Sequence, residues 1–433
     1  MHIKQIIKNG IFIAGMLSVS TIVFAQMDVS SSHVMDFPRH IEITLDESIK
    51  QALDSNPEIK ALRKDVDIAY GEIIEANTFS NPEASYSTKE GEESDEKPNV
   101  EFELEKEFRL GTWGPKRKAA KAGYEVAKEK LRASEQKLVQ EVKTSFFSLL
   151  SLEGKSELAQ DVFKLNDELA QIARTRLEKG EVSEVEANIL EVERDRSIQE
   201  KKSLEAAYYE ELLTFKNLLG YSSEAEVKPQ KESYNRYSEH NVDDYLDFAG
   251  GNRPEILSAQ NRIMQTKADA TLAKRESLPP VTVGFLYEQE TSGEDLMGGR
   301  ISIPIPIFDR NQSRIYQTKA ASQQAEAEQE GIRFQVEREI RATYKNLELL
   351  DESIDIYEQK MGPKLEKTLE IYKDGYQNGQ VSIFEFFSFE RQYFEAKGDY
   401  LSLLNEYAQA AAELERVIGG KPEDIKSMKG DRK

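Results

Sequence analysis

Candidate catalytic and metal-binding residues are scarce in this chain. Beyond residue 25 the histidines are His33, His40 and His240, and none lies close to another at metal-ligand spacing, so at most a weak site between the first two stays open. The chain has no cysteine and no Gly-rich loop followed by Lys-Ser or Lys-Thr that would hold nucleotide phosphates. Glutamate pairs are frequent, but among 79 acidic residues they are no sign of acid–base catalysis. The sequence therefore predicts no enzyme, no cofactor and no metal centre.

The most informative polar residues lie in one short alternating segment, Asn99 to Leu110. Its apolar set is Val100, Phe102 and Leu104, and its acidic set is Glu101, Glu103 and Glu105. A period of two indicates a strand with one apolar and one acidic face. Two interpretations stay open at this point. The apolar set faces lipid and the acidic set a water-filled lumen, or the segment belongs to a soluble sheet with a solvated acidic face.

Three further segments are predicted to be strands. Val281, Val283, Phe285 and Tyr287 form one alternating set, Ile301, Ile303, Ile305 and Ile307 form another, and Ala84 to Thr88 form the weakest. The acidic, Gly-containing segments Glu90 to Pro98 and Glu290 to Gly299 are predicted loops. Four strands cannot close a membrane barrel, which needs at least about eight. If these strands span a membrane, several chains must therefore pool them.

The elements that position these strands occur twice along the chain. Asn56-Pro57-Glu58 recurs as Arg253-Pro254-Glu255 after 197 positions, and Gly180 and Leu219-Gly220 recur as Gly379 and Ile418-Gly419 after 199. This period is far longer than that of solenoid repeats. We therefore predict two large similar units, residues 26–220 and 253–420, with a polar linker at 221–252 and a polar tail at 421–433.

Within each unit the sequence predicts a short helix, a hairpin and two long helices joined by a tight turn. Thr44 and Glu47 fit a capping box, and Pro57 fits the first turn of a helix to about Phe79. Four long helical segments follow, and apolar residues recur at coiled-coil spacing in two of them, from Leu158 to Ile172 and from Tyr400 to Leu414. The first segment spans residues 115–177 and ends before Gly180, and the second runs back to about residue 219. The third spans residues 312–376 with a kink at Gly362-Pro363, and the fourth spans residues 381–418.

The start of the chain predicts export. Lys4 and Lys8, an apolar run from Ile11 and a small-residue site at Ala25 are typical of a signal peptide over residues 1–25. No later segment has the length and apolarity of a transmembrane helix. The net charge of −21 argues against nucleic acid and anionic membrane surfaces as partners.

With its repeats and strands in place, the chain resembles the TolC-like outer-membrane efflux proteins, especially the heavy-metal and drug branch of the RND type. The resemblance spans nearly all of residues 42–420. It rests on the two Pro-Glu repeats, on the strand exit Ile303-Pro304-Ile305-Pro306-Ile307-Phe308-Asp309-Arg310, and on the helix turns Tyr372-Lys373-Asp374-Gly375-Tyr376-Gln377-Asn378-Gly379 and Arg176-Leu177-Glu178-Lys179-Gly180.

This resemblance implies a mainly α fold with a small β part. Three chains would form a homotrimer, in which the long antiparallel coiled-coil helices make an α-barrel in the periplasm and the strands make a twelve-stranded β-barrel in the lipid of the outer membrane. The turns at Gly180 and Gly379 would face a periplasmic adaptor, or membrane fusion protein, and an inner-membrane pump.

The resemblance also implies roles for residues at the turns. Tyr376 matches a tyrosine that helps to hold the tip closed, Glu385 matches an acidic residue of the constriction, and Glu186 is its partner in the first unit. Ser388 stands at the second acidic position and Val381 at the position of a gate arginine, which puts an arginine lock at that position in doubt. The phenylalanines from Phe384 to Phe389 are expected to pack the tip helices together, with a drug-binding cluster as the alternative.

The leading functional hypothesis is a passive exit duct of a tripartite efflux system that carries metal cations or drugs. The same duct could serve a type I protein secretion system. A soluble periplasmic coiled-coil scaffold is a third hypothesis, but a scaffold has no need of four amphipathic strands. A hydrolase would need a globular domain with a concave site, for which the helical repeats leave little chain.

Overall fold

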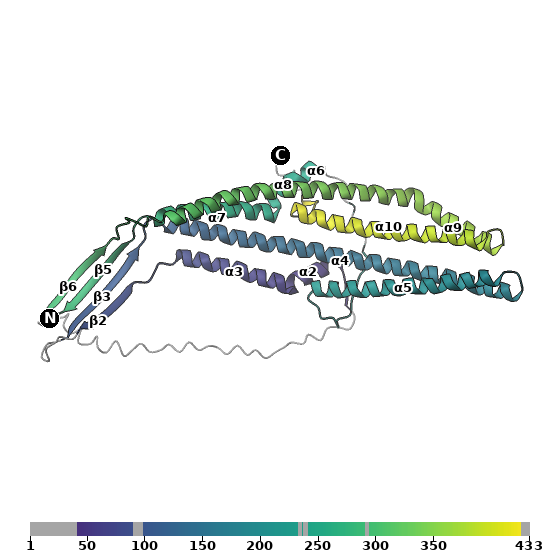
Figure 1. Ribbon diagram of the computed structural model, residues 1–433, viewed down its shortest axis with the longest axis horizontal. Coiled ribbons are helices and arrows are strands. Elements are labelled where there is room, and N and C mark those ends of the chain that lie inside the picture. Colours follow the sequence, from purple (N-terminus) through teal and green to yellow (C-terminus); the bar gives the residue numbers. More distant parts are fainter. Residues whose placement is uncertain (1–40, 90–97, 233–235, 237–240, 291–293, 426–433) are drawn as a thin grey trace. The chain divides into compact units, whose positions relative to one another are not determined.

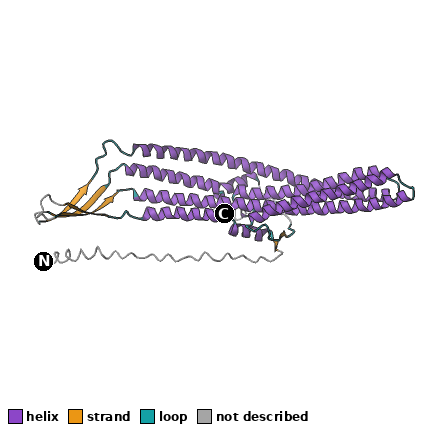
Figure 2. Cartoon of the chain, turned by 60° about the horizontal axis from the view of Figure 1, so that its bottom comes forward, coloured by secondary structure: helices purple, strands orange, loops and turns teal. Residues whose placement is uncertain are grey.

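The described part of the chain is mainly α-helical with a small β part, as predicted. A computed structural model of the protein describes residues 41–89, 98–232, 236, 241–290 and 294–425 (Figures 1 and 2). The predicted signal peptide, the three histidines beyond it and nearly all of the predicted loop 90–98 lie outside these residues. Among the described residues no helix has the length and apolarity needed to cross a membrane.

Two hairpins, one from each half of the sequence, join in one antiparallel sheet (Figure 1). The first consists of β2 (Glu83–Lys89) and β3 (Asn99–Phe108), and the second of β5 (Val281–Gln289) and β6 (Asp295–Ser302). The strand order is β2-β3-β5-β6, so the two hairpins meet where β3 pairs with β5. The described strands leave β2 and β6 as edges with one neighbour each.

The prediction for the last strand was wrong in its position. The alternating isoleucines suggested a strand over residues 301–307, whereas β6 spans Asp295–Ser302 and the segment after it is irregular. Pro304 and Pro306 lack the N–H group that a ladder needs, so pairing ends before them. The strand instead includes Gly298 and Gly299, which the sequence analysis placed in a loop.

The first half begins with α2 (Leu45–Ser55) and α3 (Pro57–Asn77). The predicted capping box is confirmed, because Thr44 accepts a hydrogen bond from the N–H of Glu47 and the Glu47 side chain bonds back to Thr44. The long α4 (Trp113–Glu178) follows the hairpin, and α5 (Glu184–Leu218) returns beside it. These bounds lie within a few residues of the predicted ones.

The second half repeats this order with α6 (Val242–Asn252), α7 (Pro254–Glu276), α8 (Gln312–Ile356), α9 (Gly362–Gln377) and α10 (Ile383–Ile418). A π-helical turn, Tyr357–Met361, separates α8 from α9. The irregular turn lies directly before Gly362-Pro363, where a kink was predicted, since Pro363 cannot donate the helical hydrogen bond that would keep the turn regular.

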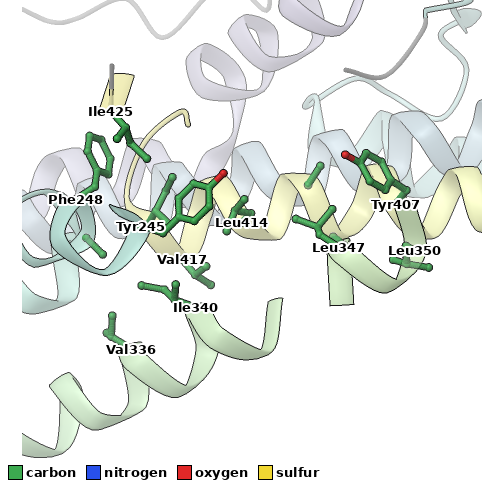
Figure 3. Packing of buried hydrophobic residues seen from close by; sticks show 14 of the residues in the cluster. Tyr245, Phe248, Val336, Ile340, Leu347, Leu350, Tyr407, Leu414, Val417 and Ile425 are labelled. Atoms are coloured by element: carbon green, nitrogen blue, oxygen red, sulfur yellow. The ribbon is translucent and has the colours of Figure 1, made fainter. Parts of the chain in front are cut away.

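Two segments that the sequence analysis treated as polar connections are partly structured. The linker 221–252 contains α6 and the short strand β4 (Val227–Pro229), which pairs in parallel with β1 (Ile41–Ile43). In the tail, Ile425 is buried in the same apolar core as Tyr245 and Phe248 of α6 (Figure 3). The apolar side chains of these segments are few and scattered, so no periodic pattern predicted the helix or the strand.

The long helices α4 and α8 each change partner along their length. α4 packs against α3 and α5, α8 packs against α7 and α10, and α4 also contacts α7 and α10 of the other half. Each half has its own apolar core: one gathers Phe146, Leu149 and Phe215 with β1 and β4, and the other gathers Ile340, Tyr407 and Leu414 (Figure 3). Contacts of α4 with both neighbours in the second half hold the repeats together.

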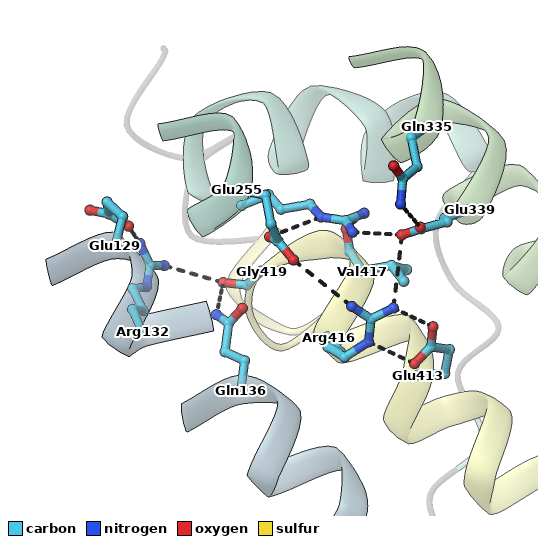
Figure 4. A network of polar contacts seen from close by, with 11 residues as sticks. Glu129, Arg132, Gln136, Glu255, Gln335, Glu339, Glu413, Arg416, Val417 and Gly419 are labelled. Carbon is cyan, nitrogen blue, oxygen red and sulfur yellow. Dashed lines mark hydrogen bonds and ion pairs between the residues drawn. The ribbon is translucent and has the colours of Figure 1, made fainter. Parts of the chain in front are cut away.

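A polar network also connects the halves (Figure 4). Arg253 is 2 % exposed, and its guanidinium donates to Glu339 of α8 at 2.6 Å and to the Val417 carbonyl of α10 at 3.1 Å. From α4, Gln136 donates to the carbonyl oxygen of Gly419 at 2.9 Å. This network fixes the end of α10 against both α4 and α7.

Candidate functional site

The two helix turns that the sequence singled out are built alike. Gly180 and Gly379 both have positive φ, 73° and 70°, which a residue without a side chain adopts at little cost. Each N–H bonds to a carbonyl of the helix that has just ended, Leu177 at 2.9 Å and Tyr376 at 3.0 Å. These two glycines therefore reverse the chain sharply at the ends of α4 and α9, as predicted.

A shared apolar cluster packs the two turns together. From the α4–α5 hairpin it takes Leu169, Ala170, Ala173, Ala187 and Leu190, and from the α9–α10 hairpin it takes Tyr376, Ile383, Phe386 and Phe387. We call this cluster with both turns the helix-turn end. The cluster gives the two halves one common structure at this end, because each hairpin covers the apolar side chains of the other.

The predicted gate residue Tyr376 lies inside this cluster. Its side chain is 2 % exposed, and its ring lies 5.9 Å from that of Phe386. Its hydroxyl makes no hydrogen bond of ordinary geometry, although Glu186 and Arg176 act on it electrostatically. Burial first, and then the nearby Glu186 carboxylate, raise the pKa of the Tyr376 hydroxyl. Tyr376 therefore packs the turns within one chain, while a role in gating stays a prediction.

The two predicted acidic residues occupy equivalent places but have different contacts. Glu385 forms a capping box, in which one carboxylate oxygen accepts from the Ser382 N–H at 3.0 Å and from its hydroxyl at 2.8 Å. These bonds lower the pKa of the exposed Glu385. Glu186 follows the N-cap Ser183, whose hydroxyl accepts from the Glu186 N–H at 3.2 Å. Glu186 thus lies in the first turn of α5, and its carboxylate acts electrostatically on the Tyr376 hydroxyl.

One residue of the first turn motif was given no role of its own from the sequence. Arg176 of α4 pairs with Glu181 at 3.4 Å, affects the pKa of Tyr376, and lies so near the second turn that a Cβ added to Gly379 would be 4.0 Å from its guanidinium. The sequence has Val381 at the position of a gate arginine, which put an arginine lock at that position in doubt. Arg176 belongs to the other half of the sequence, and its only signal there was its place as the first residue of the turn motif that ends at Gly180.

The phenylalanines at the start of α10 have mixed roles. Phe386 and Phe387 are buried in the cluster, and Phe389 stacks on Tyr372 with ring centres 4.9 Å apart. Phe384 is exposed. The expected packing role is therefore confirmed for three of these rings within the chain.

The sheet separates its side chains by face as the alternation predicted. Phe102 lies opposite Tyr86 and Tyr287, and Leu104 lies opposite Phe285, so an apolar face continues across the strands. This face is largely exposed in the single chain. Along β3, Glu101, Glu103 and Glu105 alternate with Val100, Phe102 and Leu104. The three glutamates therefore lie on the opposite face of the sheet.

Polar contacts on the acidic face link the two hairpins. Glu103 pairs with Arg300 at 2.9 Å, and Glu101 accepts a hydrogen bond from Ser87 at 3.2 Å. Glu105 lies opposite Glu83 on one side and Gly284 on the other. This face is therefore mainly polar, with Leu286 of β5 and Leu296 of β6 as its apolar members.

Comparison with known proteins decides the family. The profile of the family described as "Outer membrane efflux protein" matches residues 48–220 and 246–420, which together make up most of the chain. The chain belongs to the outer membrane efflux protein family. It is therefore a protein of the outer membrane, which contradicts the hypothesis of a soluble periplasmic scaffold.

Individual relatives are distant in sequence but similar over almost their whole length. The cobalt-zinc-cadmium resistance protein CzcC of Cupriavidus metallidurans is 24 % identical over 398 residues, 91 % of this chain and 95 % of the relative. A solved structure of CusC matches with TM-score 0.75 at 17 % identity, covering 88 % of this chain and 93 % of that one. VceC of Vibrio cholerae gives TM-score 0.74 at 16 % identity, covering 87 % and 96 %. These structures confirm the fold of a TolC-like efflux channel.

Proposed function

We propose that this protein is the passive exit duct of a tripartite efflux system. Three copies would form one channel that receives cargo from an inner-membrane pump through a periplasmic adaptor and releases it outside the cell. The observation that carries this proposal is the family match over both repeats. The energy for transport would come from the pump, so the duct itself needs no catalytic residue.

The sheet edges and the exposed apolar side chains of the single chain support a homotrimer. Among the described strands, β2 and β6 each have a neighbour on one side alone, and unpaired edges invite pairing with another chain. Large apolar side chains are also exposed where the strands join the helices, with Ile305 at 81 % and Phe308 at 90 %. Monomeric proteins rarely expose extended apolar patches. Pooling of the strands of three chains into a twelve-stranded barrel would pair the edges and place the apolar face in lipid.

In this assembly the two faces of the sheet take the roles that alternation suggested. Val100, Phe102 and Leu104 would face lipid, because their side continues into exposed apolar residues on β2 and β5. The acidic set, Glu101, Glu103 and Glu105, would line the water-filled lumen. A lumen lined by carboxylates favours cations over anions.

The helix-turn end would be the periplasmic tip that faces the adaptor. Gly180 and Gly379 would shape it, and Glu186, Tyr376 and Glu385 would lie at its constriction. A single ring of Glu385 carboxylates, rather than a double one, follows from Ser388 at the second acidic position. Because Glu385 is exposed while it caps α10, the same residue can fix the helix start and present its charge.

Divalent metal cations are the cargo that we propose. The relative CzcC is named for resistance to cobalt, zinc and cadmium, and it is similar to this chain over nearly its whole length. The acidic face of the sheet is compatible with such cargo, and a passive duct needs no metal-binding relay. Among the described residues no group of three His, Cys, Asp or Glu could hold a metal ion.

The proposal is tested by deleting the gene in its own organism and measuring retained cargo. The deletion strain should accumulate cobalt, zinc or cadmium and regain efflux when the wild-type gene is supplied. A parallel panel of drugs and dyes, together with an assay for secreted proteins, distinguishes metal, drug and protein cargo. Unchanged retention of every cargo would contradict the proposed function.

A further inference from the structure

A cavity of about 510 Å³ lies between α4, α5 and α10. Its volume falls within the range typical of small-molecule sites. Val162, Phe387 and Phe394 give it apolar walls. Its charged lining comes from Glu193, Arg196 and Glu200 of α5 and from Glu390, Arg391 and Glu395 of α10, while α4 contributes the uncharged Asn166. Carboxylates therefore outnumber guanidinium groups around a partly apolar space.

Two buried oxygen atoms among the residues that line this cavity have no hydrogen-bond partner. Glu390 and Asn166 are each 4 % exposed, and neither Glu390 Oε1 nor Asn166 Oδ1 receives a hydrogen bond. The Asn166 amide donates to the Ser197 hydroxyl at 3.4 Å, and that hydroxyl donates to backbone carbonyls of α5. Buried oxygens are rarely left unpaired, and both of these oxygens can accept a hydrogen bond from a bound donor.

The chemistry of the lining distinguishes organic cations from metal ions. An ammonium group offers three hydrogen-bond donors and no acceptor. It therefore suits the two oxygens without a partner, Oε1 of the Glu390 carboxyl group and Oδ1 of Asn166. The aromatic walls would accommodate an apolar body attached to it. A bare metal ion is less suited, because no group of three His, Cys, Asp or Glu in the described part of the chain has the required arrangement.

We propose that this cavity binds small organic ammonium ions with an aromatic or apolar body, and that each ion replaces the proton of Glu390. The Glu390 O–H bond breaks, its proton passes to solvent, and the carboxylate forms an ion pair with the ammonium group. The site is separate from Glu385 and Glu186, and it does not depend on the proposed efflux role.

The protonation state of Glu390 makes binding dependent on pH. Burial, and then the charge of Glu193, raise the pKa of Glu390 to about 8, while Arg391 opposes this rise. Ligand-free Glu390 is thus mostly neutral at pH 7 and mostly ionised above pH 8. The ammonium ion requires the ionised form, so its affinity should rise more than tenfold between pH 6.5 and pH 8.5.

Isothermal titration calorimetry of the full detergent-extracted protein with phenethylammonium chloride tests the proposal. Binding should follow this pH dependence, and titrations in buffers of different ionisation enthalpy should show nearly one proton released at pH 7. The uncharged analogue 2-phenylethanol should bind at least tenfold more weakly at pH 8.5. Glu390→Gln resembles the neutral acid in shape, and it should lose the pH dependence and most of the affinity at pH 8.5.

Glu406→Gln, an exposed position on α10 outside the cavity, is the matched control and should behave as wild type. Equal binding of 2-phenylethanol, no binding of phenethylammonium, or pH dependence that persists in Glu390→Gln would overturn the proposal. Zinc chloride is titrated in parallel. Binding of zinc that requires Glu390, without binding of phenethylammonium, would overturn it in favour of a metal site.

Discussion

Asn56 and Arg253 occupy equivalent positions in the two repeats but stabilise them differently. The Asn56 side chain accepts hydrogen bonds from the N–H groups of Glu58 and Ile59 and so caps α3. Arg253 makes no such cap at α7. Its guanidinium instead joins α7 to α8 and α10 (Figure 4). The asparagine at this position thus caps one helix, whereas the arginine at the equivalent position connects helices.

Loss of the Arg253 side chain should destabilise the protein strongly. Arg253→Ala removes one hydrogen-bond donor from the Val417 carbonyl and one from Glu339, which keeps Gln335 as a donor, and breaking a buried charged pair costs about 3–5 kcal/mol. Arg63→Ala removes a partly exposed pair with Glu135 and should cost at most about 1 kcal/mol. Thermal unfolding followed by circular dichroism measures both variants. Equal melting temperatures would contradict the importance of the network.

Glu390 should make the protein less stable as pH rises. The pKa of Glu390 is about 8 in the folded chain against an ordinary 4.5, so the folded state keeps a proton that the unfolded state has lost. The stability due to this proton is complete below about pH 4.5 and is lost as pH rises through 8. Melting temperatures from pH 5 to 8.5 should therefore fall more in wild type and Glu406→Gln than in Glu390→Gln. Parallel curves for all three would refute this assignment.

At the scale of elements, patterns with strong periodicity predicted the structure well. The long helices and the strands β3 and β5 were found because their apolar residues recur regularly. β6 was misplaced because the isoleucines continue their alternation past Pro304, where pairing has already stopped. Arg253 and Arg176 could not be assigned from sequence, because their roles depend on helices that meet only after folding.

Glycine substitutions at two helix ends should separate backbone strain from steric clash. Gly419 and Gly180 both have positive φ, 82° and 73°, so an alanine at either position costs about 1–2 kcal/mol. A Cβ at Gly419 would also lie 2.7 Å from Arg253 Cα, whereas nothing lies within 4 Å of one at Gly180. Gly419→Ala should therefore lower the melting temperature much more than Gly180→Ala. The reverse order would contradict the described packing of α10 on α7.

The two faces of β3 should respond differently to mutation. Phe102→Arg places a charge on the face proposed to meet lipid, at a cost of about 2–4 kcal/mol near the middle of a bilayer. Glu103→Gln on the opposite face removes a charge from the proposed lumen and should leave assembly intact. The fraction of each variant recovered in separated outer membranes is the measurement. Normal recovery of Phe102→Arg with loss of Glu103→Gln would reverse the assignment of the faces.

At the scale of the whole molecule, the single chain is an incomplete unit. Its sheet has two open edges, its apolar sheet face is exposed, and its helix-turn end brings both repeats together. The sequence predicted this incompleteness from four strands alone, since four cannot close. It could not predict the cargo, because no motif in the sequence is specific for a metal, a drug or a protein.

The most direct test is the mass of the mature protein extracted by detergent from separated outer membranes, measured by light scattering with the detergent contribution subtracted. We predict a stable particle of three chains in that fraction. A monomer recovered from the soluble periplasmic fraction would contradict the trimeric duct.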